Sequence, residues 1–243
     1  MCYLNLEKVS KIYAAGNEPV TALSGISLKV DRGEFIAITG PSGCGKSTLL
    51  HILGGLSKPS SGQVYVRGRS LYEQKLSELA LYRRKQVGIV YQFYNLVPEL
   101  TARENLILPA LMDRRKIEVA WIDEIFKILG LQDKQDFYPS QLSGGQQQKI
   151  AVGRALVTRP PLLLADEPTG NLDSAKRDEL LALFTNLNRQ EKTTIILVTH
   201  DADVARSAQR RIHMADGTIS NNTSTSPDVS HSMEKEQKGW ALT

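Results

Sequence analysis

Cysteine is scarce in this sequence, with only Cys2 and Cys44 among 243 residues. Cys44 lies inside a glycine-rich loop, so we expect no disulfide between the two and a reduced, cytosolic setting. The N-terminus also lacks the charged and apolar segments, followed by small residues, that mark a secretory signal. These absences exclude a small secreted domain held together by disulfides.

Long hydrophobic runs and a strong charge of one sign are missing as well. No apolar stretch approaches the roughly 20 residues that a membrane-spanning helix needs, so a role at a membrane requires a partner chain. The net charge is only +4 and the basic residues are spread along the chain, so we expect no nucleic-acid partner. With 41% hydrophobic residues, the chain can form one large α/β domain, or a core with a smaller subdomain.

The hydrophobic pattern predicts strands and helices in alternation, which implies βαβ units and a parallel sheet. A mainly helical segment within 101–138 interrupts the alternation. A polar, mobile tail is expected over 222–243, which is rich in Ser, Thr and charged residues. The expected strands are 4–9, 23–30, 34–39, 63–66, 87–90, 162–166, 194–199 and 211–215, and the expected core helices are 47–56 and 174–187.

A glycine loop joins the strand at 34–39 to the helix that follows. Its sequence is the pattern of a phosphate-binding P-loop, in which glycines let backbone N–H groups surround phosphates and the helix N-terminus adds its positive end. Lys46 is expected to reach the β- and γ-phosphates, and the Ser47 hydroxyl to ligate Mg²⁺. The predicted phosphate contacts are Gly40, Ser42, Gly43, Cys44, Gly45, Lys46, Ser47 and Thr48.

Two adjacent carboxylates follow the apolar strand at 162–166. The carboxyl ends of strands are where ligands bind in open α/β sheets. Asp166 is expected to hold Mg²⁺ together with the P-loop hydroxyl, and Glu167 to act as the general base on the attacking water. A strand ending in solvated acids would be the ordinary interpretation of this segment alone, but the P-loop upstream favours the catalytic one.

Residues 142–146 read Leu-Ser-Gly-Gly-Gln, and a second short run, Gly-Arg-Ala-Leu, follows at 153–156. This pattern resembles the signature motif that defines ABC ATPases. Ser143 can cap the helix that follows, and the glycines leave backbone N–H groups free to bind an anion. The residues expected to contact ATP are Ser143, Gly144, Gly145 and Gln146.

The resemblance covers about residues 3–221 and implies a fold. It implies an α/β P-loop NTPase with a RecA-like core and mainly parallel sheet, an antiparallel β subdomain, and a helical subdomain of about 95–158 that carries the signature. In this family the signature of one subunit contacts the γ-phosphate on the P-loop of the other. One copy of each motif therefore implies a homodimer around two ATP.

Four more positions match family motifs. Tyr13 resembles the aromatic residue that stacks on adenine, and Gln92 the glutamine that senses Mg²⁺ and the attacking water. Asp173 lies in a segment that resembles the loop bridging the two subunits, and His200 resembles the switch histidine at the γ-phosphate. Two alternatives stay open: Tyr13 as a structural tyrosine, and Asp173 as a simple helix cap. The resemblance implies that Lys46, Gln92, Glu167 and His200 carry the catalysis.

Residues 92–105 and 167–173 resemble the bacterial subgroup of lipoprotein-releasing, macrolide-export and bacitracin-export ATPases. That subgroup implies a separate transmembrane permease docking between Gln92 and Val97, which places the chain at the inner face of the cell membrane. Its cargo would be a peptide, a lipid-like molecule or an antibiotic. The apolar side chains of this segment form the expected docking groove, or alternatively pack under the helical subdomain; they are Phe93, Tyr94, Leu96 and Val97.

Two other classes compete with a transporter subunit. A signalling or cell-division complex would use the same ATPase cycle without moving cargo, and the residues above are compatible with it. Soluble ABC proteins of chromosome maintenance need a long coiled coil between P-loop and signature, and those of translation carry two cassettes per chain. Neither feature occurs here.

Overall fold

The computed structural model describes residues 2–15, 18–113 and 116–224. Its strands are β1 (Cys2–Ala15), β2 (Glu18–Asp31), β3 (Phe35–Thr39), β4 (Ser61–Val66), β5 (Arg69–Ser70), β6 (Val87–Val90), β7 (Leu162–Asp166), β8 (Thr194–Val198), β9 (Arg210–Ala215) and β10 (Thr218–Ser224). Its α-helices are α1 (Lys46–Leu53), α2 (Leu76–Gln86), α3 (Ala102–Met112), α4 (Val119–Leu129), α5 (Gly144–Leu156), α6 (Ser174–Glu191) and α7 (Ala202–Ala205).

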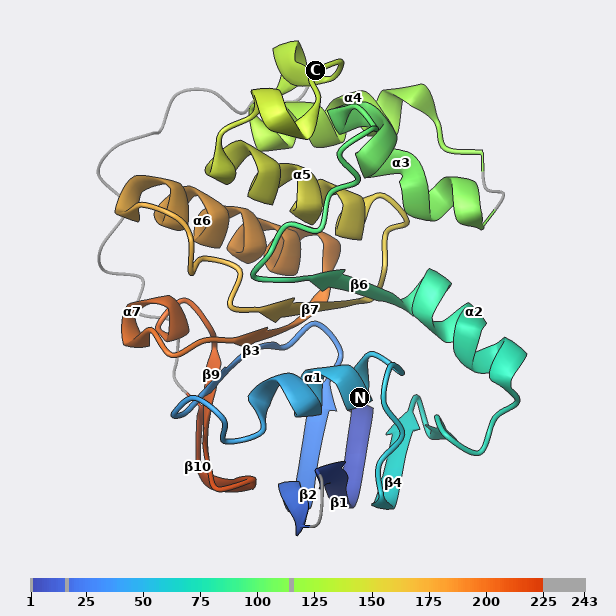
Figure 1. Cartoon of the computed structure of the whole chain (residues 1–243), viewed down its shortest axis with the longest axis vertical. Coiled ribbons are helices and arrows are strands. Elements are labelled where there is room, and N and C mark those ends of the chain that lie inside the picture. The colour runs from blue at the N-terminus through green and yellow to red at the C-terminus, as the bar shows by residue number, and fades with distance from the viewer. Residues whose placement is uncertain (1, 16–17, 114–115, 225–243) are drawn as a thin grey trace.

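The strands form two sheets (Figure 1). The larger sheet has the order β10-β9-β3-β8-β7-β6, and all of its strands except β10 run parallel. The smaller sheet has the order β2-β1-β4-β5 and is antiparallel. The expected α/β core with a mainly parallel sheet and an antiparallel β subdomain is therefore confirmed.

Two hydrophobic cores lie on opposite faces of the larger sheet. Strand β3 feeds both, because successive side chains of a strand point to opposite faces: Phe35 and Ala37 enter one core, and Ile36 and Ile38 the other. Helices α3 to α7 pack on the first face, whereas α1 and the antiparallel sheet pack on the second. The central strands are buried on both faces, as parallel strands usually are.

The helical segment forms as its periodicity indicates. Ile122, Ile125, Phe126 and Leu129 lie on one buried face of α4. The helix ends at Gly130, whose φ of 66° is a left-handed conformation that glycine adopts without steric cost. Helices α3, α4 and α5 all lie within the expected insertion at 95–158.

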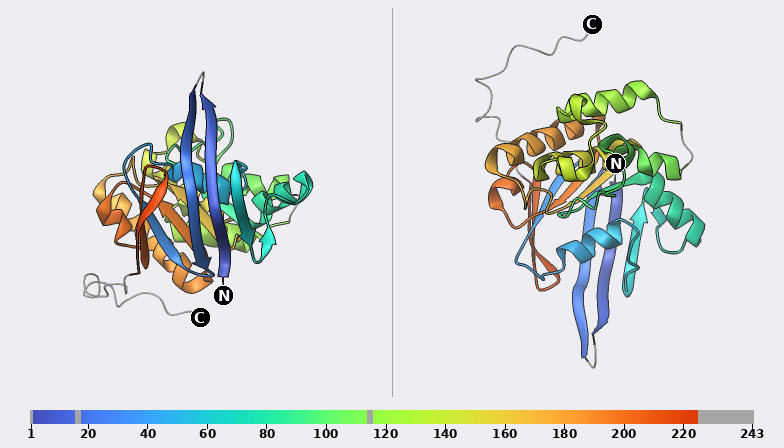
Figure 2. Two further views of the ribbon diagram at one scale, coloured as in Figure 1. Left: turned by 90° about the horizontal axis from the view of Figure 1, so that it is seen from below. Right: turned by 45° about the horizontal axis from the view of Figure 1, so that its top comes forward.

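Several elements differ from the sequence-based expectation. Strands β1 and β2 form a hairpin much longer than expected, which projects from the body of the molecule (Figure 2). Helix α1 ends at Leu53 rather than at residue 56, and α2, β5 and β10 were not expected. Helix α2 carries no clear apolar stripe and has Tyr82 as its one buried residue, so its sequence lacks the usual signal.

The C-terminal boundary also shifts. Strand β10 continues to Ser224 and pairs with Arg210 at the start of β9, so the first three residues of the expected polar tail belong to the sheet. The remainder of that tail, 225–243, lies outside the described residues. None of the helices in the described part of the chain is long and apolar enough to cross a membrane.

Candidate active site

The P-loop connects β3 to α1 and uses glycine where the backbone is tightly enclosed. Gly40 has a φ of 148°, and a Cβ at this position would lie 2.1 Å from the carbonyl oxygen of Met214. Gly45 has a φ of 100°, and its Cβ would lie 2.2 Å from the carbonyl oxygen of Ala22 on β2. Any larger residue would clash with backbone, so the loop shape depends on these two glycines.

Lys46 holds the loop closed upon itself. Its side chain is buried, and its Nζ donates hydrogen bonds of 2.9 Å to the carbonyl oxygens of both Gly40 and Pro41. The Nζ also lies 3.9 Å from the Cys44 sulfur. The amine is thus held inside the loop by two neutral acceptors.

Ser47 and Asp166 meet at the start of α1 and the end of β7. The Ser47 hydroxyl donates to Asp166 Oδ1 at 3.1 Å. A hydroxyl and a carboxylate oxygen side by side fit Mg²⁺, which prefers oxygen ligands and completes its shell with water and nucleotide phosphates. Within the described ranges, no group of three or more His, Cys, Asp or Glu side chains forms a metal cage.

Glu167 and His200 form the next pair along the same sheet edge. Strands β7 and β8 are neighbours, and His200 Nδ1 lies 2.8 Å from Glu167 Oε1. Only 15% of the Glu167 side chain is exposed, against 66% for His200. Glu167 has a φ of 47°, and its amide donates to the carbonyl oxygen of Val198. The left-handed backbone is uncommon for a residue other than glycine.

Gln92 lies beside these acids because β6 neighbours β7. Asn171 donates from its side-chain amide to the carbonyl oxygen of Gln92 at 3.2 Å, and a Cβ on Gly170 would lie 3.1 Å from Gln92 Nε2. Burial, and then the negative charge of Asp166, raise the pKa of Tyr91. The expected residues Gln92, Asp166, Glu167 and His200 therefore follow adjacent strands at one edge of the sheet, beside the P-loop.

The signature motif starts α5. Ser143 accepts a hydrogen bond from the amide of Gln146, and the Gln146 side chain accepts one from the amide of Ser143, forming a capping box. Gly144 and Gly145 leave room for neighbours: a Cβ on Gly144 would lie 2.7 Å from the Tyr94 hydroxyl. Because α5 and α1 pack on opposite faces of the sheet (Figure 1), the chain does not bring its own signature to its own P-loop.

Asp173 caps α6 in the single chain. Its carboxylate accepts a hydrogen bond from the amide of Lys176 and forms an ion pair with the Lys176 ammonium. These hydrogen bonds, that of the ammonium first, hold the pKa of Asp173 below its usual value. The helix-cap interpretation is therefore realised here, and a contact of Asp173 with ATP or a second subunit remains a prediction.

Tyr13 is separated from the P-loop within the chain. It lies on the projecting β1–β2 hairpin, opposite Val20, and both side chains are exposed. Two residues further along β2, Ala22 contacts the P-loop through Gly45. Two residues of a strand span about 7 Å, so the Tyr13 ring is within the reach of a nucleotide whose phosphates occupy the loop.

Two residues without a predicted role, both on α5, join the parts of the site. Gln148 of α5 is buried and donates to the carbonyl oxygens of Pro168, at 2.7 Å, and Tyr91. Arg154 of the same helix donates to the carbonyl oxygens of Tyr94, at 2.8 Å, and Asn95. The Gly-Arg-Ala-Leu run at 153–156 contains Arg154, but no pattern pointed to the contacts of either residue, because their partners lie far away in the sequence.

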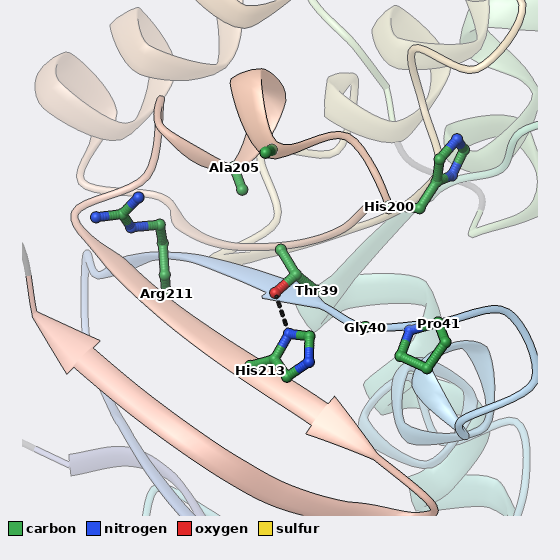
Figure 3. Close-up of a pocket in the computed structure, with 8 residues that line it drawn as sticks. Thr39, Gly40, Pro41, His200, Ala205, Arg211 and His213 are labelled. Carbon is green, nitrogen blue, oxygen red and sulfur yellow. Dashed lines mark hydrogen bonds between the residues drawn. The ribbon is translucent and has the colours of Figure 1, made fainter.

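A cavity of about 430 Å³ opens beside the P-loop. Figure 3 shows Pro41 and His200 on one side of it and Arg211 on the other, with Thr39 hydrogen-bonded to His213 between them. The side of the P-loop that faces His200 is therefore accessible in the single chain.

Sequence and structure comparisons place this architecture in one family. Residues 23–170 match the family described as ABC transporter. The chain is 46% identical over 220 residues to a lipoprotein-releasing system ATP-binding protein, LolD 1, of Chlorobium chlorochromatii, covering 89% of each chain. It is 44% identical to the LolD protein of Bordetella pertussis, covering 89% of this chain and 94% of that one.

A longer protein and a solved structure are similar to this chain as well. The chain is 45% identical to the macrolide export ATP-binding/permease protein MacB of Sodalis glossinidius, covering 91% of this chain but 34% of that one. The structure superposes with a TM-score of 0.85 on the ATP-binding cassette MJ0796 in a dimeric, post-hydrolysis state bound to ADP and Pi, with 39% identity and coverage of 91% and 98%.

The chain belongs to the ABC transporter family and is an ATPase of that family. The predicted resemblance to the lipoprotein-release and macrolide-export subgroup is confirmed, because the LolD and MacB proteins are among its relatives. The roles of individual residues follow from the geometry above and are proposed next.

Proposed function

We propose that two copies of this chain close around two ATP and that hydrolysis drives a separate transmembrane permease. The main observation that supports a dimer is the separation of α1 from α5 by the larger sheet. The P-loop of one copy must meet the Ser143 helix start of another to enclose the γ-phosphate. The dimeric state of MJ0796 supports this assembly.

Hydrolysis is assigned to the pairs at the sheet edge. Glu167 takes a proton from the attacking water, and His200 orients the Glu167 carboxylate through the 2.8 Å contact while reaching toward the γ-phosphate. Lys46 exchanges its two loop carbonyls for phosphate oxygens. Ser47 and Asp166 would hold Mg²⁺, which would supply positive charge to offset that of the phosphates. Gln92, which follows the neighbouring strand β6, orients the attacking water and would help to hold the metal.

We assign the binding of the adenine base to the exposed ring of Tyr13. The P-loop and the signature motif supply the other contacts with the phosphates. Aromatic rings bind bases by stacking, and this interaction does not involve the phosphate groups. Asp173 is assigned to the interface between the two copies. It lies at the exposed N-terminus of α6 and forms an ion pair with Lys176, whose side chain lies beside Gly145 of the signature.

The permease is assigned to the segment from Gln92 to Val97. Phe93 lies in this segment and is 71% exposed, so its aromatic side chain, of a kind enriched at protein interfaces, is available to a partner. Leu96 instead packs against the core under the helices, so the two interpretations of this segment apply to different residues. The chain then lies at the inner face of the membrane, and the LolD and MacB names of its relatives favour a peptide, lipid-like or antibiotic cargo.

Purification of the full chain from its native membrane, followed by identification of co-purifying proteins, tests this proposal. A multi-spanning membrane protein is expected, and its reconstitution with this chain should give ATP-dependent movement or extraction of a cargo molecule. Partner-dependent hydrolysis without any moved molecule would instead favour a signalling complex. Recovery of a soluble partner alone would contradict the permease.

A further inference from the structure

Lys11 covers one face of the Tyr13 ring. Its Nζ lies 5.0 Å from the centroid of that ring. The β1–β2 register shifts between Lys11 and Ile12, and the ring contact itself shows that the two side chains lie together. An ammonium within about 6 Å of a ring centroid is attracted by the electron density of the ring face. The ring is 38% exposed, so it keeps surface available for another group.

The same ammonium is attached to the loop that follows α1. Lys11 Nζ donates to the carbonyl oxygen of Lys58 at 2.8 Å. Ser60 adds two further links to the same part of β1: its amide donates to the carbonyl oxygen of Ser10, and its hydroxyl accepts from the amide of Ile12. Three residues of β1 just before Tyr13 are therefore fixed to the segment 58–60.

This attachment connects the hairpin to the P-loop from two sides. Helix α1 begins at the P-loop and leads into the loop that holds Lys11. On the other strand of the hairpin, Ala22 contacts Gly45 directly. The position of the Tyr13 ring relative to the phosphate-binding loop is therefore set by packing and hydrogen bonds, although the hairpin itself projects into solvent.

We propose that Lys11 is a positioning residue for the nucleotide base: it occupies one face of Tyr13, so that adenine stacks on the opposite face. The inference rests on the proposed role of Tyr13 as the adenine platform. Lys11 does not touch the base. It restricts the rotation of the ring before ATP binds, and a group that is already ordered loses less entropy on binding.

A general attraction between the Lys11 charge and the phosphates would give a different pattern of ligand affinities. An ammonium that merely attracts ATP would strengthen the binding of any polyphosphate, with or without a base. A residue that orders the stacking ring affects only ligands that carry a base. Inorganic tripolyphosphate, which has the charge of the nucleotide tail and no base, therefore separates the two effects.

The test measures the affinities of the full chain for ATP and for inorganic tripolyphosphate. Lys11→Met keeps the length of the side chain and loses its charge, and it should weaken ATP binding by about twofold to fivefold and leave both tripolyphosphate binding and kcat unchanged. Lys11→Arg should restore ATP binding. Lys29→Met, at an exposed lysine further along the hairpin, is the control with the same change of net charge.

The variant Tyr13→Ala separates failure of the adenine platform from failure of the positioning role of Lys11. In that background Lys11→Met should have no further effect on ATP affinity. If Tyr13→Ala itself leaves ATP affinity unchanged, the adenine platform is wrong. If Tyr13→Ala weakens ATP binding but Lys11→Met does not, or if Lys11→Met weakens tripolyphosphate binding equally, the positioning role is overturned while the adenine platform stands.

Discussion

The P-loop and the segment after β6 lie at the same sheet edge but are built differently. The P-loop is enclosed by backbone contacts, and the Lys46 ammonium is already satisfied by two carbonyl oxygens. The segment from Gln92 to Val97 instead exposes Phe93 and is held to α5 largely through Arg154. One region is a closed loop whose ammonium already has acceptors, whereas the other leaves an aromatic side chain exposed at the proposed permease contact.

Glu167→Gln tests the region around the P-loop most strongly. Loss of a general base lowers the rate by about 100-fold to 10,000-fold, so steady-state ATP hydrolysis should be almost abolished. ATP binding should persist, because Lys46 and the loop are unchanged, and ATP-bound dimers should accumulate in light scattering. Glu191→Gln, at the exposed end of α6, should behave as the unaltered protein. Turnover near normal in Glu167→Gln would refute the assignment.

Phe93→Asp tests the segment from Gln92 to Val97. Loss of an aromatic anchor from an interface costs about 2 kcal/mol or more, or roughly 30-fold in affinity. Binding to the co-purified permease should weaken by this factor, while the basal ATPase activity of the isolated chain stays unchanged. Leu76→Asp, at a leucine that is 85% exposed on α2, is the control. Equal losses in both variants would mean that Phe93 is not a specific contact.

Ser143→Ala separates the signature from a simple helix cap. Loss of a cap costs about 1 kcal/mol of stability, and Thr101→Ala should cost the same, because Thr101 forms an equivalent capping box on α3. Only Ser143→Ala should also lower ATP-dependent dimerisation and hydrolysis, by about tenfold if one charge-assisted hydrogen bond is lost. Thermal unfolding and ATPase assays of both variants give the answer.

Arg154→Lys should have the smallest effect. The planar guanidinium of Arg154 reaches two carbonyl oxygens at once, whereas an ammonium is a single compact donor group. Desolvation lowers the pKa of Arg154, yet an arginine remains charged at neutral pH. Stimulation of hydrolysis by the permease should fall severalfold at unchanged basal rate. Arg206→Lys, at an exposed arginine, should change neither rate.

Sequence patterns predicted the parts of the molecule that are local in the chain. The strands before Gly40 and Glu167, the stop at Gly130 and the helix start at Ser143 each depend on a few consecutive residues, and each forms where expected. The contacts of Arg154 with the segment after β6 join residues about 60 positions apart. No local pattern encodes such a contact, because it depends on how α5 packs over the sheet.

The hairpin and α2 show a second limit. Exposed residues such as Ile12 and Val20 carry no core-facing alternation, so the length of the β1–β2 ladder depends on pairing between the strands rather than on burial. Helix α2 has a single buried residue, Tyr82. Where tertiary contacts rather than an apolar stripe stabilise an element, hydrophobic periodicity gives little signal.

The sheet that separates α1 from α5 has a genetic consequence. In a mixed pair, a copy defective at Lys46 still offers an intact Ser143, and a copy defective at Ser143 still offers an intact P-loop. Their combination leaves one composite site whole and the other doubly defective. Two inactive alleles should therefore complement each other within a single assembly, which two defects in the same half of the site cannot do.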